Sequence, residues 1–273
     1  MYEYKEAISK RVGGISILNA NEAFKQVKFC ELSGVLDLTW DGDVIYYATS
    51  NGSVGYLSVA SDGREINISQ DSILTYIDYN SDRLLSVCTK GNFYLCEKET
   101  MKVLNQCQAS TTESWCCQFI NDSIAIGSDS GLAEIFDGKT FKTSMTLKHD
   151  AGVCQILNYS DNKISTGSYD EHLRIWDLRN PHEPLRKIHV EGGGIWRHKF
   201  TTDVDVWIAA MYVGFTLMRI DELEGNQELY RVANRNDGEL AYGLDTREVD
   251  DKQFQLLTCT FYDNKLRIFE ITE

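Results

Sequence analysis

Basic residues are scarce in this 273-residue sequence. It has 27 lysines and arginines against 41 aspartates and glutamates, giving a formal net charge of −14 and an isoelectric point near 4.8. A protein that binds nucleic acid non-specifically needs a basic face to replace the counterions on phosphate. The composition therefore argues against a nucleic-acid partner, and it is compatible with a cationic substrate or partner.

The sequence also lacks the segments by which proteins enter or cross membranes. It contains no run of about 18 apolar residues, and its first ten residues, MYEYKEAISK, lack the apolar core of a signal peptide. Its eight cysteines include no C-x-x-C pair, and several lie inside apolar, strand-like runs. We therefore expect reduced thiols that serve as small core residues in a cytoplasmic protein with no membrane partner.

Proline is limited to Pro181 and Pro184, but turn signals such as TSNGS, TKGN and SDSG recur along the chain, separated by short runs typical of strands. One apolar strand recurs with starts 38 to 46 residues apart, at Val35, Leu74, Trp115, Val153, Ile195 and Ala241. A period of this length is that of a four-stranded propeller blade. The sequence thus predicts an all-β fold, a β-propeller, as a single domain over residues 1–273.

The stretch GSYDEHLRIWD, residues 167–177, is the best-formed repeat, and it resembles a WD repeat. It predicts a buried polar chain from the Trp176 ring N–H to Thr166, then to His149, and then to Asp170 in the turn. Buried polar groups must be paired, so these four residues are assigned to structure. Glu171 and His172 in the same turn are left available for function, or are simply solvated there.

The two ends of the chain allow two blade counts. The last repeat stops after its third strand, KLRIFEI, and the N-terminal segment contributes YKEAIS, GISIL and FKQVKF. In a seven-bladed propeller, the N-terminal segment forms an incomplete blade without its innermost strand. In the six-bladed alternative, FKQVKF supplies the fourth strand of the last blade. The seven-bladed count leaves open strand edges, which are a liability.

Motifs of known catalytic classes are missing. GSDSG at 127–131 has Asp at the nucleophile position of G-x-S-x-G, and a strand rather than a helix follows the glycines of EGGGIW at 191–196. No H-E-x-x-H or EF-hand sequence is present. We therefore expect no metal and no cofactor.

One predicted rim of the propeller collects aromatic and acidic side chains. Tyrosine, tryptophan and carboxylates together suit a quaternary ammonium, through ring faces and complementary charge. The residues expected there are Glu171, His172, Glu191, Trp196, Tyr212, Asp237, Tyr242, Tyr262 and Asp263.

Six segments together resemble the diphthine methylesterase family, the WD-repeat proteins of diphthamide biosynthesis. They are SGVLDLTW, STGSYDEHLRIWDLRNPHEPL, EGGGIWRHKF, AAMYVGF, LAYGLDT and LLTCTFYDNKLRIFE, in order from about residue 33 to 273. The resemblance implies a seven-bladed propeller that hydrolyses a methyl ester on translation elongation factor 2. The implied substrate is a modified histidine with a trimethylammonium group and a methylated carboxyl. Family members carry more chain at the N-terminus, so we expect the innermost strand of the first blade and the outer strand of the last to be absent.

Ester hydrolysis needs an activated water and donors for the developing oxyanion. Our hypothesis makes His172 the general base, with Glu171 or Asp263 as its orienting partner and His198 as the alternative base. Either Arg197 or the backbone N–H groups of Gly192 to Gly194 would stabilise the oxyanion. The substrate-binding residues would be Trp196, Tyr242 and Tyr262, which form the cation-facing wall, and Glu191 on the same rim. The alternative function is a non-catalytic WD-repeat adaptor that presents its rim to protein partners.

Overall fold

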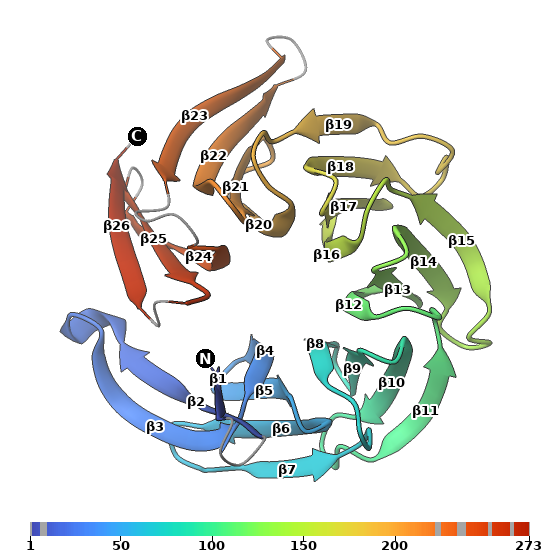
Figure 1. Ribbon diagram of the computed structural model, residues 1–273, viewed down its shortest axis with the longest axis vertical. Helices are drawn as coiled ribbons and strands as arrows, with labels where there is room; N and C mark the ends of the chain where they lie inside the picture. The colour runs from blue at the N-terminus through green and yellow to red at the C-terminus, as the bar shows by residue number, and fades with distance from the viewer. Residues whose placement is uncertain are drawn as a thin grey trace. The chain divides into compact units, whose positions relative to one another are not determined.

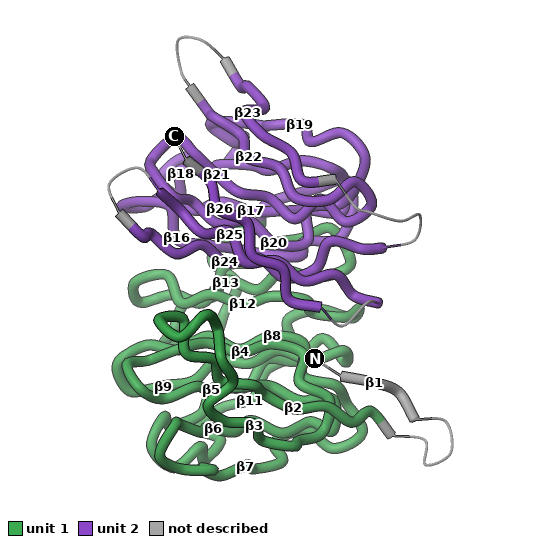
Figure 2. The backbone as a smooth tube through the Cα atoms, turned by 90° about the vertical axis from the view of Figure 1, so that its left-hand side faces the viewer, with its two compact units in different colours: residues 1–146 green, residues 147–273 purple. Residues whose placement is uncertain are grey.

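Short apolar runs separated by tight turns form antiparallel strands throughout the part of the chain that the computed structural model describes (Figure 1). The structure describes residues 2–5, 10–221, 225–233, 239–250, 253–262 and 265–272. Contacts divide the chain into two compact units, Met1–Thr146 and Leu147–Glu273, which are coloured separately in Figure 2.

The first unit begins with a three-stranded sheet, which is followed by three four-stranded sheets. The first sheet contains β1 (Tyr2–Lys5), β2 (Lys10–Asn19) and β3 (Lys25–Ser33), and the 3-10 helix η2 (Ala20–Glu22) lies between β2 and β3. The second contains β4 (Val35–Asp41), β5 (Val44–Thr49), β6 (Ser53–Ser58) and β7 (Arg64–Asn67). The third contains β8 (Leu74–Tyr79), β9 (Arg83–Cys88), β10 (Asn92–Glu97) and β11 (Val103–Gln108). The fourth contains β12 (Ser114–Ile120), β13 (Ser123–Ser128), β14 (Leu132–Asp137) and β15 (Thr143–Lys148).

The second unit has two four-stranded sheets and a final three-stranded sheet. The fifth sheet contains β16 (Val153–Ser160), β17 (Lys163–Ser168), β18 (His172–Asp177) and β19 (Arg186–His189). The sixth contains β20 (Ile195–Phe200), β21 (Asp205–Ala210), β22 (Gly214–Asp221) and β23 (Gly225–Ala233). The last contains β24 (Ala241–Asp250), β25 (Gln253–Thr260) and β26 (Leu266–Thr272).

The predicted all-β, WD-repeat propeller fold is confirmed. The six sheets from β4 onward follow the six repeats, and each starts at the predicted residue except the fourth, which starts at Ser114 instead of Trp115. The N-terminal segment adds a three-stranded sheet of its own, in which β3, which includes most of FKQVKF, pairs with β2. The family pattern predicted a short first sheet and a short last sheet, and both have three described strands.

Within each unit, the core lies between consecutive sheets. The second strand of each complete sheet from β5 to β21 is buried almost throughout, because it is covered on both faces. Burial of each large aliphatic side chain contributes about 1.5–3 kcal/mol. All eight cysteines are free, and five of them are buried in first, second or third strands: Cys88, Cys96, Cys116, Cys117 and Cys154. Burial raises the pKa of the Cys96 thiol to about 12, so this residue stays a neutral, small apolar side chain.

The polar chain predicted in the fifth sheet is present from Trp176 to His149. The Trp176 ring N–H donates to Thr166 Oγ1 at 2.9 Å, and Thr166 Oγ1 lies 2.8 Å from His149 Nε2. Asp170 accepts both Arg174 guanidinium N–H groups, at 2.9 and 2.6 Å, and the Asp150 backbone N–H at 2.9 Å. Burial alone raises the pKa of Asp170, but the Arg174 and backbone donors outweigh it and lower this pKa to about 2. The turn before β18 is therefore held by a permanent carboxylate.

Candidate functional site

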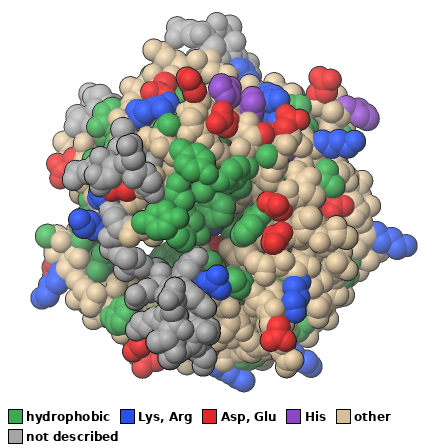
Figure 3. Space-filling view, viewed as in Figure 1, with side chains coloured by type: hydrophobic (Ala, Val, Ile, Leu, Met, Phe, Trp, Pro, Cys, Tyr) green, Lys and Arg blue, Asp and Glu red, His purple; other side chains and the backbone are tan. Residues whose placement is uncertain are grey.

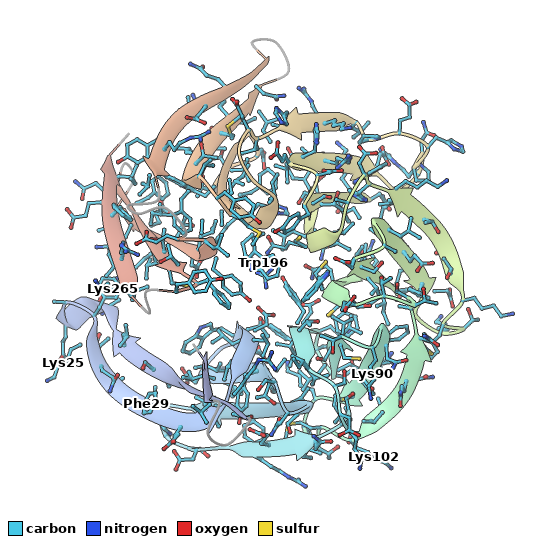
Figure 4. The ribbon with its side chains drawn as sticks, viewed as in Figure 1. Lys25, Phe29, Lys90, Lys102, Trp196 and Lys265 are labelled. Atoms are coloured by element: carbon cyan, nitrogen blue, oxygen red, sulfur yellow. The ribbon has the colours of Figure 1, made fainter. Side chains whose placement is uncertain are left out.

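Four aromatic side chains of the second unit form a continuous row. Ring centroids are 5.0 Å apart between Trp196 and Tyr242, 5.2 Å between Tyr242 and Phe261, and 4.9 Å between Phe261 and Tyr262. Trp196 is the second residue of β20 (Figure 4), Tyr242 is the second residue of β24, and the other two follow β25. We call these four residues the aromatic row. It brings together the three residues predicted to form the cation-facing wall.

The aromatic row runs from the interior to solvent. Trp196 and Tyr242 are half-buried, whereas Phe261 is 36% and Tyr262 65% exposed. Hydrophobic side chains also form a broad patch on the face seen in Figure 3. Exposed ring faces of this kind attract organic cations. Phe261 was missed by the sequence prediction, although it directly precedes Tyr262 and the TFYD sequence offered that signal.

Arg197 lies at the inner end of the aromatic row. Its guanidinium carbon is 5.2 Å from the Trp196 ring centroid, and its Nη1 donates to the carbonyl oxygens of Trp196 at 2.9 Å and Cys154 at 3.3 Å. The Trp196 ring therefore already has a cation against it. A second cation is better placed on the outer rings, while Arg197 favours an anion or a developing oxyanion close to Trp196.

The glycine loop before β20 packs against two tyrosines. A side chain at Gly194 would approach the Tyr169 backbone to 2.9 Å, and one at Gly193 would approach the Tyr212 nitrogen to 2.8 Å. The hydroxyls of Tyr169 and Tyr212 are 2.8 Å apart. Glycine is required in this loop because the two turns, before β18 and before β22, press against it.

The predicted general base has its described partners within its own sheet and the turn before β18. His172 contacts Asp170 and His189: its Nδ1 is 2.6 Å from the Asp170 carbonyl oxygen, and its ring centroid is 5.1 Å from that of His189. The prediction that Glu171 orients His172 is not supported, because Glu171 Oε2 accepts from His189 Nε2 at 3.1 Å. His172 and His189 are directly opposite each other on β18 and β19, which explains why the carboxylate reaches the other ring.

The alternative base, His198, is part of the core. Its side chain is 1% exposed, its Nε2 lies 2.8 Å from Ser165 Oγ, and its backbone N–H donates to Gln155 Oε1 at 2.5 Å. Burial, with a smaller contribution from the Arg197 charge, lowers the pKa of His198 to about 3. A neutral imidazole enclosed in this way cannot reach a substrate, so His198 is a structural residue.

The remaining predicted residues are placed only in part. Glu191 is exposed at the start of the glycine loop, and Asp263, like Asp237, lies outside the described residues. Over the described ranges, no group of three or more His, Cys, Asp or Glu side chains is placed to hold a metal ion together. The same part of the chain has no helix with the length and apolar character needed to cross a membrane.

No known protein-family model matches the chain. The Diphthine methyltransferase homolog of Dictyostelium discoideum is 29% identical over 291 residues, which cover 90% of this chain and 79% of that protein. The human Diphthine methyltransferase is 33% identical over 152 residues, which cover 50% of this chain. The chain is thus similar to proteins named diphthine methyltransferase. The matched part is only 33% of the human protein's own length.

Solved structures support the fold. A chain in a crystal structure of the Mitotic Checkpoint Complex superimposes with a TM-score of 0.71 at 16% sequence identity, over 88% of this chain and 78% of that chain. At this identity the likeness concerns the fold alone.

Proposed function

We propose that this protein acts in diphthamide biosynthesis as a carboxylic-ester hydrolase, which removes the methyl ester from diphthine methyl ester on translation elongation factor 2. The observation that carries the proposal is the similarity to the Dictyostelium Diphthine methyltransferase homolog over 90% of the chain. The relatives' name describes a methyl transfer, whereas our choice of hydrolysis rests on the sequence resemblance described above. A cytoplasmic location and further protein partners on the rim belong to the same proposal.

The aromatic row and Arg197 supply two different binding features for this substrate. The trimethylammonium group carries a fixed positive charge, and the outer rings, Phe261 and Tyr262, would contribute about 0.5–2 kcal/mol to holding it. The ester carbonyl would lie toward Arg197, whose guanidinium is fixed by two backbone carbonyls.

In the proposed reaction, water attacks the ester carbonyl carbon and a general base takes its proton. His172 is our proposed base, because donation from Nδ1–H to the Asp170 carbonyl leaves the Nε2 lone pair available. Arg197 stabilises the tetrahedral oxyanion. When the oxyanion collapses, the carbon–methoxy bond breaks and the methoxy oxygen receives the proton. The products are a carboxylate, methanol and a proton.

The test uses the purified chain, ester-bearing elongation factor 2 and no methyl donor. We expect the mass of the factor to fall by one CH₂ unit with release of one methanol. If its mass instead rises by one CH₂ unit, and only when a methyl donor is added to the carboxylate form, the protein is a methyltransferase. Unchanged mass in both reactions, with the factor still bound, would identify a non-catalytic adaptor.

A further inference from the structure

Two histidines face each other across the outer strands of the fifth sheet. His172 on β18 is the register partner of His189 on β19, their ring centroids are 5.1 Å apart, and the ring planes are inclined by 40°. Their side chains are 24% and 54% exposed. We call His172 and His189 the histidine pair. Figure 3 shows histidine side chains beside acidic and basic ones on the face of the molecule it presents.

Each imidazole is oriented through one nitrogen. His172 Nδ1 is 2.6 Å from the Asp170 carbonyl oxygen, and His189 Nε2 is 3.1 Å from Glu171 Oε2. When these nitrogens donate, the lone pairs remain on His172 Nε2 and His189 Nδ1. Histidines that bind metals show this pattern: the other ring N–H donates to a backbone carbonyl or a carboxylate, which fixes the tautomer and increases ligand basicity.

The separation of the rings suits one ion bound to both. A metal–nitrogen bond of about 2.0–2.1 Å places the ion about 3.2 Å from each ring centroid. With both lone pairs directed at the ion, centroids 5.1 Å apart give an angle at the ion of roughly 105°, close to tetrahedral. We propose that the histidine pair binds a divalent first-row transition ion, such as Zn²⁺, with water in the remaining positions. The two imidazoles are the only protein ligands in this proposal. Glu171 contacts His189 and does not bind the ion itself.

A backbone hydrogen bond fixes the turn beside the histidine pair, and the charged side chains nearby do not repel a bound metal cation. The Glu171 carbonyl accepts the Val190 N–H at 2.8 Å, which ties the turn to the end of β19. The charged neighbours are three carboxylates against two cations. Asp170 pairs with Arg174, Asp150 lies 3.5 Å from Lys187, and Glu171 pairs with His189. With both rings neutral, one negative charge (three minus two) remains to favour a bound cation.

Calorimetric titration of ZnCl₂ into the full chain tests this proposal. The three partly exposed thiols, Cys30, Cys107 and Cys259, are replaced by serine in every sample, so that they do not compete for zinc. We expect His172→Gln and His189→Gln each to weaken binding by about tenfold or more. His182→Gln, at an exposed loop histidine, should leave binding unchanged. Zinc should also raise the thermal midpoint of the parent protein and not that of the pair variants.

A second measurement uses the parent protein, so that the zinc site can be tested even if the histidine variants fail to fold. In the ¹⁵N-imidazole NMR spectrum of the parent protein, zinc should shift the His172 and His189 signals together while the His182 signal stays in place. Binding should weaken as pH falls, because protons compete with the metal ion for the imidazole nitrogens. Zinc affinity unaffected by either pair substitution, or imidazole signals that do not move, would overturn the site. Zinc on His172 Nε2 would occupy the lone pair that the proposed general base uses, so bound zinc and the proposed hydrolysis would compete. Neither readout involves ester hydrolysis, so a failure of the zinc site and a failure of the proposed function are distinguishable.

Discussion

At the scale of single residues, Arg197 and Trp196 are neighbours on β20 that favour ligand groups of opposite charge. The guanidinium favours an anion, and the ring face favours a cation. Arg197 lies against the ring of the residue that precedes it, and its Nη1 is anchored on carbonyl oxygens. Trp196 is thus occupied by the protein's own cation, and the exposed end of the aromatic row is left for a substrate cation. Tyr262, at 65% exposure, is the ring most accessible to it.

Substitution of Tyr262 tests whether the exposed end of the aromatic row binds the substrate cation. We expect Tyr262→Ala to raise the KM for ester-bearing elongation factor 2 by about 3- to 10-fold, because it removes one cation–π contact. The kcat should change little, since the ring is distant in the row from Arg197. Tyr262→Phe is the matched control, because it keeps the ring face and loses only the hydroxyl. If alanine and phenylalanine have the same effect, the hydroxyl and not the ring face binds the substrate.

The histidine pair illustrates what sequence reasoning at this scale cannot reach. Glu171 and His172 are adjacent in the sequence, which suggested that they interact. The side chain that Glu171 contacts, His189, is 18 residues further along the chain. That contact depends on the pairing register of β18 and β19, and a shift by one residue would place the two rings on opposite faces.

At the scale of strands and turns, the repeat could be predicted from the sequence, because each strand and turn depends on residues close to it in the chain. Tight turns need glycine at defined positions, and strands need alternating or continuous apolar residues. Gly91, in the turn between β9 and β10, has φ 77°, and a side chain there would come within 2.1 Å of the Ser110 carbonyl oxygen. The burial of His198 was not readable in this way, because its neighbours come from the adjacent sheet.

Two turn glycines with positive φ differ in the space around them. This difference predicts unequal losses of stability when each is replaced by alanine. Gly91→Ala combines backbone strain with a steric clash, so we expect a loss of about 2–4 kcal/mol in the free energy of unfolding. Gly42→Ala is the control: Gly42 has φ 59°, but a side chain there would have nothing within 4 Å. It should cost about 1 kcal/mol from the backbone alone. Urea unfolding of both variants measures the difference, and equal losses would contradict the role assigned to the clash.

At the scale of the whole molecule, side chains of first strands connect one sheet to the next. Asp37 Oδ2 accepts the Ile77 N–H at 3.0 Å, Asp78 Oδ2 accepts the Phe119 N–H at 2.7 Å, and Gln155 Oε1 accepts the His198 N–H at 2.5 Å. Each bond crosses from one repeat to the following one. The sequence showed these polar residues within apolar strands, but their partners became apparent only from how the sheets stack.

Asp78 makes this connection sensitive to pH. Burial raises the pKa of its carboxyl from 3.8 to about 6, although the N–H groups of Phe119, Tyr79 and Gln118 oppose the shift. Because the folded pKa is the higher one, folding is favoured most below about pH 4, where Asp78 is protonated in both states. As pH rises from about 4 to 6, the contribution of Asp78 to the free energy of unfolding falls by about 3 kcal/mol.

Asp78→Asn should remove that fall, because an amide does not ionise and its oxygen can still accept the Phe119 N–H. The variant is therefore expected to be more stable than the parent above pH 6 by about 1–3 kcal/mol, with the advantage disappearing toward pH 4. Thermal and urea unfolding across this range provide the measurement. Glu99→Gln, at an exposed position, removes the same formal charge from a molecule of net charge −14. A gain in both variants would assign the effect to overall charge repulsion, whereas a gain confined to Asp78→Asn assigns it to the buried carboxyl between β8 and β12.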